Sequence, residues 1–315
     1  MADTTTRGSA PESPAQLAKV TWKDTLRRTL REFKEDDLTM LAAALTYYGV
    51  LSLFPALLVL LSLLGLARTS TIDTLLENLG SLTPSAARDV VTNAVRDLQG
   101  SNQTAGFAFV AGLLGALWSA SGYVGGFMKA SNAIYEVEEG RKFWKLKPLQ
   151  IAVTVVIMLM TTIIVIAIVV TGPVAQRVGV IIGVGDAAVT VFNIAKWPII
   201  AVIVSLIFAF LYYIGPNVKQ PGFKWVSPGG VVAVVLWVIA SALFAFYVAN
   251  FGSYSKTYGS MAAVIIFLIW LWITNVVMLL GAELNAEIER GRQIEAGHDP
   301  EQEPFLPHRE APKES

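Results

Sequence analysis

The chain has 315 residues, of which 54% are hydrophobic and 15% are charged, and it carries no net charge. Soluble domains carry charged residues at about a quarter of their positions, so this composition excludes an ordinary water-soluble fold. The neutral balance leaves no basic field for nucleic acid, and we expect no nucleic-acid partner. With no cysteine, thiol nucleophiles, cysteine-ligated metals and disulfide frameworks are excluded.

Two different segments precede the first long apolar stretch. Residues 1–16 are rich in Ala, Ser, Thr and Pro and are predicted to be a disordered tail. Residues 17–37 predict an amphipathic helix with apolar residues at helical spacing and basic residues around them. We take it to be an interfacial helix whose bases face anionic headgroups. The alternative is a helix packed on cytoplasmic loops of the same protein. The apolar residues are Trp22, Leu26, Leu30 and Phe33.

Six stretches contain no Asp, Glu, Lys or Arg, and each is 22 to 31 residues long. Because about 20 apolar residues cross the hydrocarbon core, each stretch predicts one transmembrane helix. The fold class is therefore all-α: a polytopic membrane protein with six transmembrane helices in a domain of residues 38–290. The stretches are Leu38–Ala67, Leu98–Met128, Pro148–Gln176, Trp197–Val218, Trp225–Ser255 and Thr257–Ala282.

Three other segments complete the domain assignment. The outer connections 68–104 and 172–195 contain apolar pieces too short to cross a bilayer, so we expect helical loops on the outer surface. The acidic, proline-containing residues 291–315 predict a disordered cytoplasmic tail.

The distribution of Lys and Arg predicts the orientation. Seventeen of these residues lie in the two termini and in the loops 136–147 and 215–228, whereas six lie in the intervening connections. The positive-inside rule then places both termini in the cytoplasm, and an even number of spans agrees. The chain is therefore predicted to cross its membrane several times.

Polar and small residues within the spans and just beyond their ends are the candidates for function. Buried polar groups in a membrane normally face a protein interior or a cavity, so they predict either a substrate path or interhelical contacts. Small residues at three- and four-residue steps predict close helix packing. Lys129 either extends to the headgroups or pairs with Glu283, and Glu287 and Arg290 can pair at i, i+3. The path candidates are Tyr47, Tyr48, Pro55, Asn132, Asn275 and Glu283, and the packing candidates are Gly115, Ser119, Gly122 and Gly126.

The spans contain no group suited to catalysis. Every carboxylate lies outside the six stretches, both histidines lie in the polar tail, and no Walker-type phosphate loop is present. We therefore predict no catalytic residue, no metal site, no cofactor and no enzymatic activity.

Nine short motifs follow one another along the chain. They are residues 41–48 (LAAALTYY), 52–55 (SLFP), 117–121 (LWSAS), 132–135 (NAIY), 141–144 (RKFW), 213–217 (YIGPN), Trp225 with Pro228-Gly229, 258–260 (YGS) and 281–285 (GAELN). With these motifs the chain resembles the BrkB/YihY family of bacterial inner-membrane proteins over residues 20–290. The resemblance implies a bacterial inner-membrane location and six helices with cytoplasmic termini. Members have been labelled a tRNA-processing ribonuclease or a serum-resistance factor, and others have been linked to envelope lipid transport.

Three functions compete at this stage. The first is a transporter or translocator of an amphipathic or lipid-like envelope solute, with membrane lipids and that solute as partners. The second is a structural or scaffolding membrane protein. The third is a membrane-bound ribonuclease, for which Glu136, Glu138 and Glu139 beside Arg141 and Lys142 would have to bind metal. The sequence does not indicate an oligomeric state.

Overall fold

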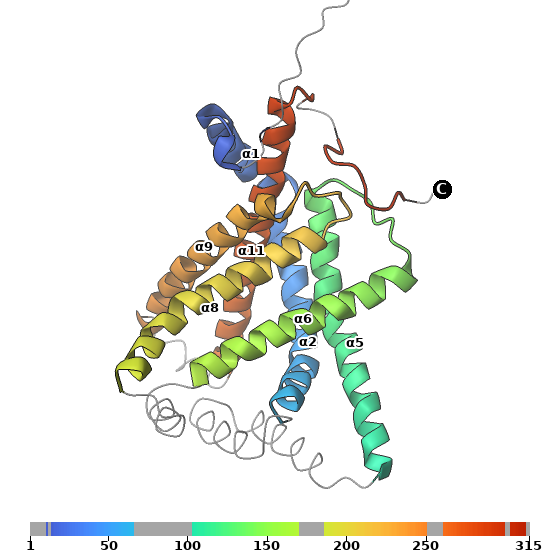
Figure 1. Cartoon of the computed structure of the whole chain (residues 1–315), viewed down its shortest axis with the longest axis vertical. Coiled ribbons are helices and arrows are strands. Elements are labelled where there is room, and N and C mark those ends of the chain that lie inside the picture. The colour runs from blue at the N-terminus through green and yellow to red at the C-terminus, as the bar shows by residue number, and fades with distance from the viewer. Residues whose placement is uncertain are drawn as a thin grey trace, which may run out of the picture. The chain divides into compact units, whose positions relative to one another are not determined.

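The computed structural model describes residues 11, 14–65, 103–169, 186–250, 261–299 and 303–312. In these parts the chain forms seven α-helices and one short 3-10 helix, which confirms the all-α prediction for them. The predicted disorder of residues 1–10 and the predicted outer helices within 68–102 lie outside the described residues. The helices are α1 (Lys19–Glu35), α2 (Leu38–Gly65), α5 (Gln103–Ile134), α6 (Phe143–Val169), α8 (Asp186–Ile214), α9 (Phe223–Asn250) and α11 (Met261–Glu295), shown in Figure 1.

Four of these helices contain segments long and apolar enough to cross a membrane. They are Phe143–Ile168, Val189–Ile214, Phe223–Asn250 and Val264–Glu295, and α2 adds the shorter apolar segment Leu38–Leu53. Long runs of Leu, Ile, Val and Ala form helices here because lipid requires every backbone polar group to be bonded within its own segment. Several such helices make the chain a multi-pass membrane protein. The total of six spans stays a prediction.

The chain divides into two compact units. The first consists of Met1–Gly49, Gly125–Leu146 and Val204–Ser315, and the second of Val50–Val124 and Lys147–Ile203. In the second unit, Lys147 of α6 binds α5: its Nζ lies 3.1 Å from the Trp118 carbonyl oxygen and 2.6 Å from Ser121 Oγ. The same ammonium lies 4.5 Å from the centre of the Trp118 ring. Lys147, at the end of a span, therefore holds α6 against α5 through its ammonium group.

In the first unit, α9 lies along α11 (Figure 1). A Cβ added at Gly281 would lie 2.6 Å from the Tyr212 hydroxyl and 2.8 Å from the Gly229 carbonyl oxygen, so only glycine fits. The Tyr212 hydroxyl donates to the Met278 carbonyl at 2.7 Å, and the Gly229 amide donates to Asn285 Oδ1 at 2.9 Å. Glycine therefore lets the α9 and α11 backbones approach closely.

Helix α1 packs on the end of α11 through its polar face. Thr25, Thr29 and Glu32 are buried, while Leu26 is 54% exposed and Leu30 is 65% exposed. The contacts follow the alternative of a helix packed on its own protein. Leu26 and Leu30, two of the four predicted apolar residues, lie outside the contact between α1 and α11 because Thr25 and Thr29 occupy it. The location of α1 in a membrane interface stays a prediction.

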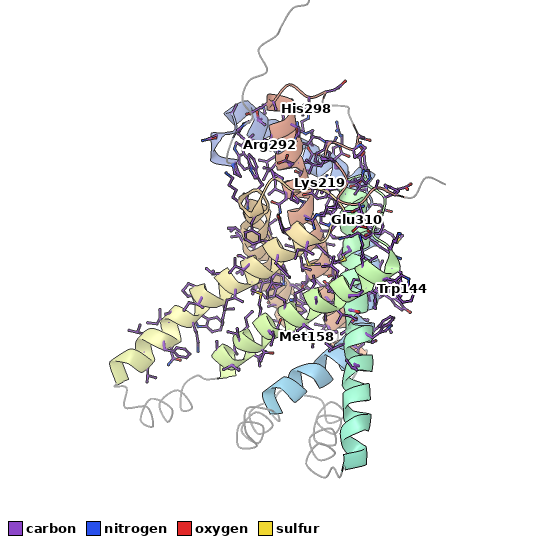
Figure 2. The ribbon with its side chains drawn as sticks, turned by 45° about the vertical axis from the view of Figure 1, so that its right-hand side comes forward. Trp144, Met158, Lys219, Arg292, His298 and Glu310 are labelled. Atoms are coloured by element: carbon purple, nitrogen blue, oxygen red, sulfur yellow. The ribbon has the colours of Figure 1, made fainter. Side chains whose placement is uncertain are left out.

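The C-terminal segment differs from the predicted disordered tail. Helix α11 continues to Glu295, and residues 303–312 pack on the first unit. The Lys219 amide donates to the Pro307 carbonyl at 2.9 Å, and the Arg309 amide donates to the Asn217 carbonyl at 2.9 Å. Figure 2 labels Lys219 and, from the C-terminal segment, Glu310. Long-range backbone bonds of this kind leave no periodic pattern in the sequence. They explain why a polar, proline-containing stretch nevertheless adopts a defined position.

Candidate functional site

A buried polar pair joins α2 to α11 within the apolar part of the first unit. Asn275 Nδ2 donates to Thr46 Oγ1 at 3.1 Å, and Asn275 is completely buried. The Thr46 hydroxyl itself donates to the Ala42 carbonyl at 2.8 Å. The indole of Trp272 donates to the Thr39 carbonyl at 3.2 Å, so α2 and α11 are joined at two levels. We call Thr46 and Asn275 the polar pair.

Two tyrosines follow the polar pair on α2. Tyr47 is 62% exposed and Tyr48 is 37% exposed, and their rings meet edge to face at 5.7 Å. The Tyr48 ring and Leu45 pack on α5, where a Cβ added at Gly126 would lie 2.9 Å from the ring. Helix α2 therefore meets α11 at the polar pair and α5 at the Tyr48 ring and Leu45.

The remaining small residues and Pro55 lie apart from this meeting point in the sequence. No described atom lies within 4 Å of a Cβ built on Gly115 or Gly122, and Ser119 is exposed. Their role in helix packing stays a prediction, whereas Gly126 has a close contact. Pro55 lies inside α2, which is continuous through it, and is partly exposed.

Asn132 belongs to a different network, at the end of α5. Its Oδ1 accepts from the Asn217 amide at 2.7 Å, and its Nδ2 donates to Glu139 Oε2 at 3.0 Å. Arg141 forms an ion pair with Glu139 at 2.7 Å and donates to the Gly215 carbonyl at 2.9 Å. Burial would raise the pKa of Glu139, but the hydrogen bonds from Arg141 lower it below its usual value. Asn132 thus fixes loop 215–219 and does not contact the polar pair.

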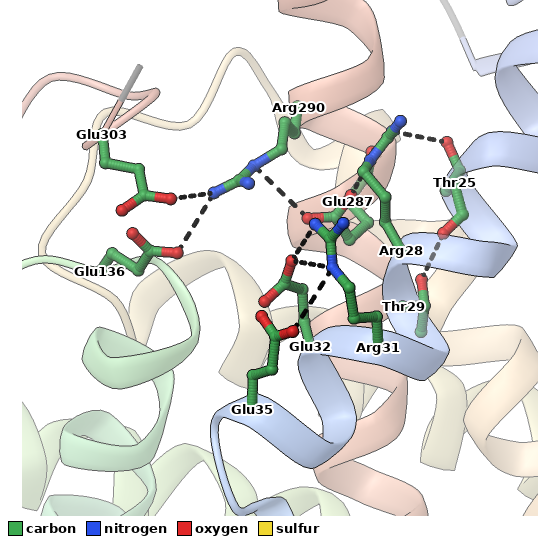
Figure 3. Close-up of polar contacts among 10 residues, drawn as sticks. All are labelled: Thr25, Arg28, Thr29, Arg31, Glu32, Glu35, Glu136, Glu287, Arg290 and Glu303. Carbon is green, nitrogen blue, oxygen red and sulfur yellow. Dashed lines mark hydrogen bonds and ion pairs between the residues drawn. The ribbon is translucent and has the colours of Figure 1, made fainter. Parts of the chain in front are cut away.

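A cluster of charged residues surrounds Arg290 where α11 leaves the apolar region (Figure 3). The Arg290 guanidinium lies 3.4 Å from Glu287, 3.2 Å from Glu136 and 3.5 Å from Glu303, which confirms the predicted Glu287–Arg290 pair. Arg28 of α1 forms a second ion pair with Glu287. Only 7% of the Arg290 side chain is exposed. We call residues 19–36, 135–141, 281–295 and 303–312 together the polar end.

Carboxyl groups in the polar end titrate close to neutrality. Burial, followed by a hydrogen bond and the charge of Glu303, raises the pKa of Glu136 to about 7. The same hydrogen bond lowers the pKa of Glu303, so the two carboxyls share one proton. Burial and then the charge of Glu32 raise the pKa of Asp36 to about 6. The polar end therefore changes its charge within the physiological pH range.

Glu283 lies where the polar end meets the apolar part of α11. Its side chain is 1% exposed, and its Oε2 accepts no hydrogen bond from any residue that the structure describes. Lys129, the alternative partner considered above, is exposed, and the ion pairs of the described residues do not include it with Glu283. Glu283 follows Asn275 by eight residues on the same side of α11, or about 12 Å along the helix axis.

The acidic residues of loop 136–139 diverge. Glu136 points to Arg290, Glu139 contacts Arg141 and Asn132, and Glu138 is exposed. Among the described residues, no group of three or more His, Asp or Glu side chains is placed to hold a metal ion.

One residue of this region escaped sequence reasoning. Asn217 is completely buried, and its Nδ2 donates to the carbonyls of Glu138 at 3.0 Å and Glu310 at 2.8 Å. The sequence marked it only as part of the motif 213–217, which carries the family resemblance. The partners of the side chain lie 79 and 93 residues away, beyond any local pattern.

Comparison with known proteins supports the architecture. The profile of the family described as "Virulence factor BrkB" matches residues 29–305. The chain belongs to the BrkB family. A ribonuclease-like protein of Bacillus subtilis, YfkH, is 31% identical to this BrkB-family chain over 265 residues, which cover 84% of the chain and 93% of YfkH.

Two membrane proteins of the UPF0761 group are also similar to this BrkB-family chain. That of Alteromonas mediterranea is 27% identical over 280 residues, covering 87% of the chain and 91% of the relative. That of Alkalilimnicola ehrlichii is 31% identical over 293 residues, but the chain spans only 60% of its length. No solved structure matches. The family is one of membrane proteins whose function is unknown.

Proposed function

We propose that this BrkB-family protein translocates an amphipathic or lipid-like envelope solute across the bacterial inner membrane. In this proposal the chain crosses the membrane six times, has both termini in the cytoplasm and catalyses no reaction. The observation that carries the proposal is the polar pair, Thr46 and Asn275, beside the accessible rings of Tyr47 and Tyr48. The pair supplies uncharged hydrogen-bonding groups between apolar helices, and the two tyrosine side chains that follow Thr46 on α2 are exposed.

The chemistry of this region fits a solute with a polar head and an apolar body. Hydroxyl and amide groups can exchange hydrogen bonds with an uncharged part of a headgroup, while neighbouring apolar side chains contact its hydrocarbon chains. Tyrosine suits such a place because its ring is apolar and its hydroxyl is polar.

The test is a flux or lipid-scrambling assay with the purified full-length protein in liposomes. Asn275→Leu should lower the protein-dependent rate about tenfold, because an apolar side chain of similar size cannot offer the amide hydrogen bonds. Asn250→Leu is the matched control: Asn250 is exposed at the end of α9 and donates to the Phe246 carbonyl of its own helix at 2.7 Å. Equal rates for the two variants would contradict the assignment of the route.

A second comparison tests whether the protein translocates any solute, independently of the route assigned to it. Protein-free liposomes and liposomes with the wild-type protein are compared across several fluorescent lipids and one lipid-like anion. A rate that the protein does not increase for any of these probes would contradict translocation and favour a scaffolding role.

A further inference from the structure

Glu283 is a buried carboxyl group whose surroundings favour its neutral form. It is 99% shielded from solvent, and its Oε2 lacks a hydrogen-bond donor among the described residues. A buried carboxylate oxygen without a donor makes the ionised form costlier than the carboxylic acid, so these surroundings favour a bound proton.

The charged groups that face Glu283 carry more negative than positive charge. The strongest electrostatic influences on it are Asp36, then Glu287 and Glu32, with Arg290 opposing them. Arg290 is also committed to Glu287, Glu136 and Glu303. By element, the groups that act on Glu283 are Glu32 on α1, Asp36 just after it, Glu287 and Arg290 on α11, and Tyr135 after α5. Arg28, Glu136 and Glu303 are linked to it only through their ion pairs with Glu287 or Arg290.

The position of Glu283 connects this carboxyl to the proposed route. Asn275 and Glu283 lie on the same side of α11, with the buried Leu279 between them. A solute that leaves the polar pair toward the polar end must pass the level of Glu283. Ionisation of this carboxyl would place a negative charge beside the path. Its electrostatic interaction with a passing solute would be strong because the local dielectric constant is low.

We propose that Glu283 is a proton-binding site of this protein and that its protonation controls passage between the polar pair and the polar end. The control of passage rests on the proposed function, whereas proton binding does not. The ligand is a single proton, exchanged with the aqueous phase through the neighbouring carboxyls Asp36 and Glu287.

Proton binding is tested by infrared spectroscopy of the purified full-length protein near neutral pH. The wild type should show the C=O stretching band of a buried carboxylic acid, which Glu283→Gln should lack. Glu138→Gln is the matched control, because Glu138 is an exposed carboxylate, and it should keep the band. Glu136→Gln removes the other carboxyl that shares a proton in this region and should also keep the band. A band that survives in Glu283→Gln overturns the proposal.

The coupling is tested by the liposome assay at a series of pH values. Where one protonation controls passage, the wild-type rate should fall about tenfold per pH unit above the transition, because the protonated fraction falls by that factor. Glu283→Gln should transport at a rate independent of pH, whereas Glu138→Gln should behave as the wild type. A pH dependence that persists in Glu283→Gln overturns the coupling. Absence of flux in every variant would contradict the proposed function, while the infrared result would still decide proton binding.

A folding control accompanies both tests. Gel filtration and thermal unfolding in detergent show whether Glu283→Gln is folded, and because glutamine has nearly the same shape as a protonated glutamate, we expect no loss of stability.

Discussion

The apolar helices and the polar end of this protein have opposite surfaces. Only 11% of the most apolar 18-residue segment of α9 is buried. Leu243 and Phe246 of α9 are 65% and 70% exposed. In the polar end, by contrast, every residue from Gly281 to Arg290 is buried, including three glutamates and one arginine. A water-soluble protein does the reverse. The difference indicates that lipid solvates the first region, and that protein contacts satisfy the charges of the second.

The same contrast assigns different energetics to the two regions. Apolar helices in lipid gain little from burial against one another, so close packing and hydrogen bonds hold them together. The polar end depends on ion pairs that are shielded from water, which are costly to break on one side. Substitutions in the two regions should therefore differ in both size and mechanism.

The largest effect is expected from Arg290→Met. It leaves Glu287, which is 2% exposed, and Glu136 without their shared guanidinium, so the free energy of unfolding should fall by about 3–5 kcal/mol. Arg31→Met is the control, because the Arg31 side chain is 57% exposed and its pair with Glu32 should contribute at most about 1 kcal/mol. Thermal unfolding in detergent measures both. Equal losses would show that the polar end is not held by its buried charges.

Close packing of the apolar helices is tested by Gly281→Ala. The added methyl group meets the Tyr212 hydroxyl and the Gly229 backbone, so the free energy of unfolding should fall by about 1–3 kcal/mol. Gly112→Ala, where no described atom lies within 4 Å of the new Cβ, is the control and should be neutral or slightly stabilising. If Gly281→Ala were as stable as its control, the α9–α11 contact would be looser than described.

A smaller effect is expected from Asn217→Ala. It removes hydrogen bonds to the backbone of Glu138 and Glu310 and should loosen residues 303–312 by roughly 1 kcal/mol. Hydrogen–deuterium exchange of peptides covering 303–312 should then become several-fold faster. Peptides from α9 should exchange as in the wild type. A uniform increase in both would indicate global destabilisation instead.

The last effect concerns pH. Because the pKa of Asp36 is raised to about 6 in the folded protein, the folded state binds more protons than the unfolded state between its ordinary pKa of about 4 and that value. The resulting cost is absent below about pH 4, grows through this window and is complete above about pH 6. The thermal midpoint should therefore decline as the pH rises through the window, and less so in Asp36→Asn. Asp37→Asn is the control: residue 37 is exposed and has φ 50°, a conformation that asparagine adopts readily. An unchanged decline in Asp36→Asn would exclude Asp36 as its source.

The apolar spans could be predicted from the sequence because lipid demands long uninterrupted apolar runs, which are visible residue by residue. Asn275 could be singled out for the same reason, as a polar residue in such a run. Its partner Thr46, the separate network of Asn132, and the docking of residues 303–312 could not be predicted. Each depends on contacts between segments 85 or more residues apart, for which composition and periodicity carry no information.

The amphipathic pattern of α1 shows a second limit. Leu26 and Leu30 suggested which face is buried, but the structure buries Thr25 and Thr29 on α11 instead. Small β-branched residues pack closely on another helix, and hydropathy does not register that.

The central claim is that lipid covers the apolar helices while both termini and the polar end face the cytoplasm. Because the chain contains no cysteine, single-cysteine variants can be labelled without background. In intact cells, a membrane-impermeant maleimide should label neither Phe246→Cys nor Glu138→Cys; in inverted membrane vesicles it should label Glu138→Cys alone. Labelling of Phe246→Cys from water, or of Glu138→Cys in intact cells, would contradict the account.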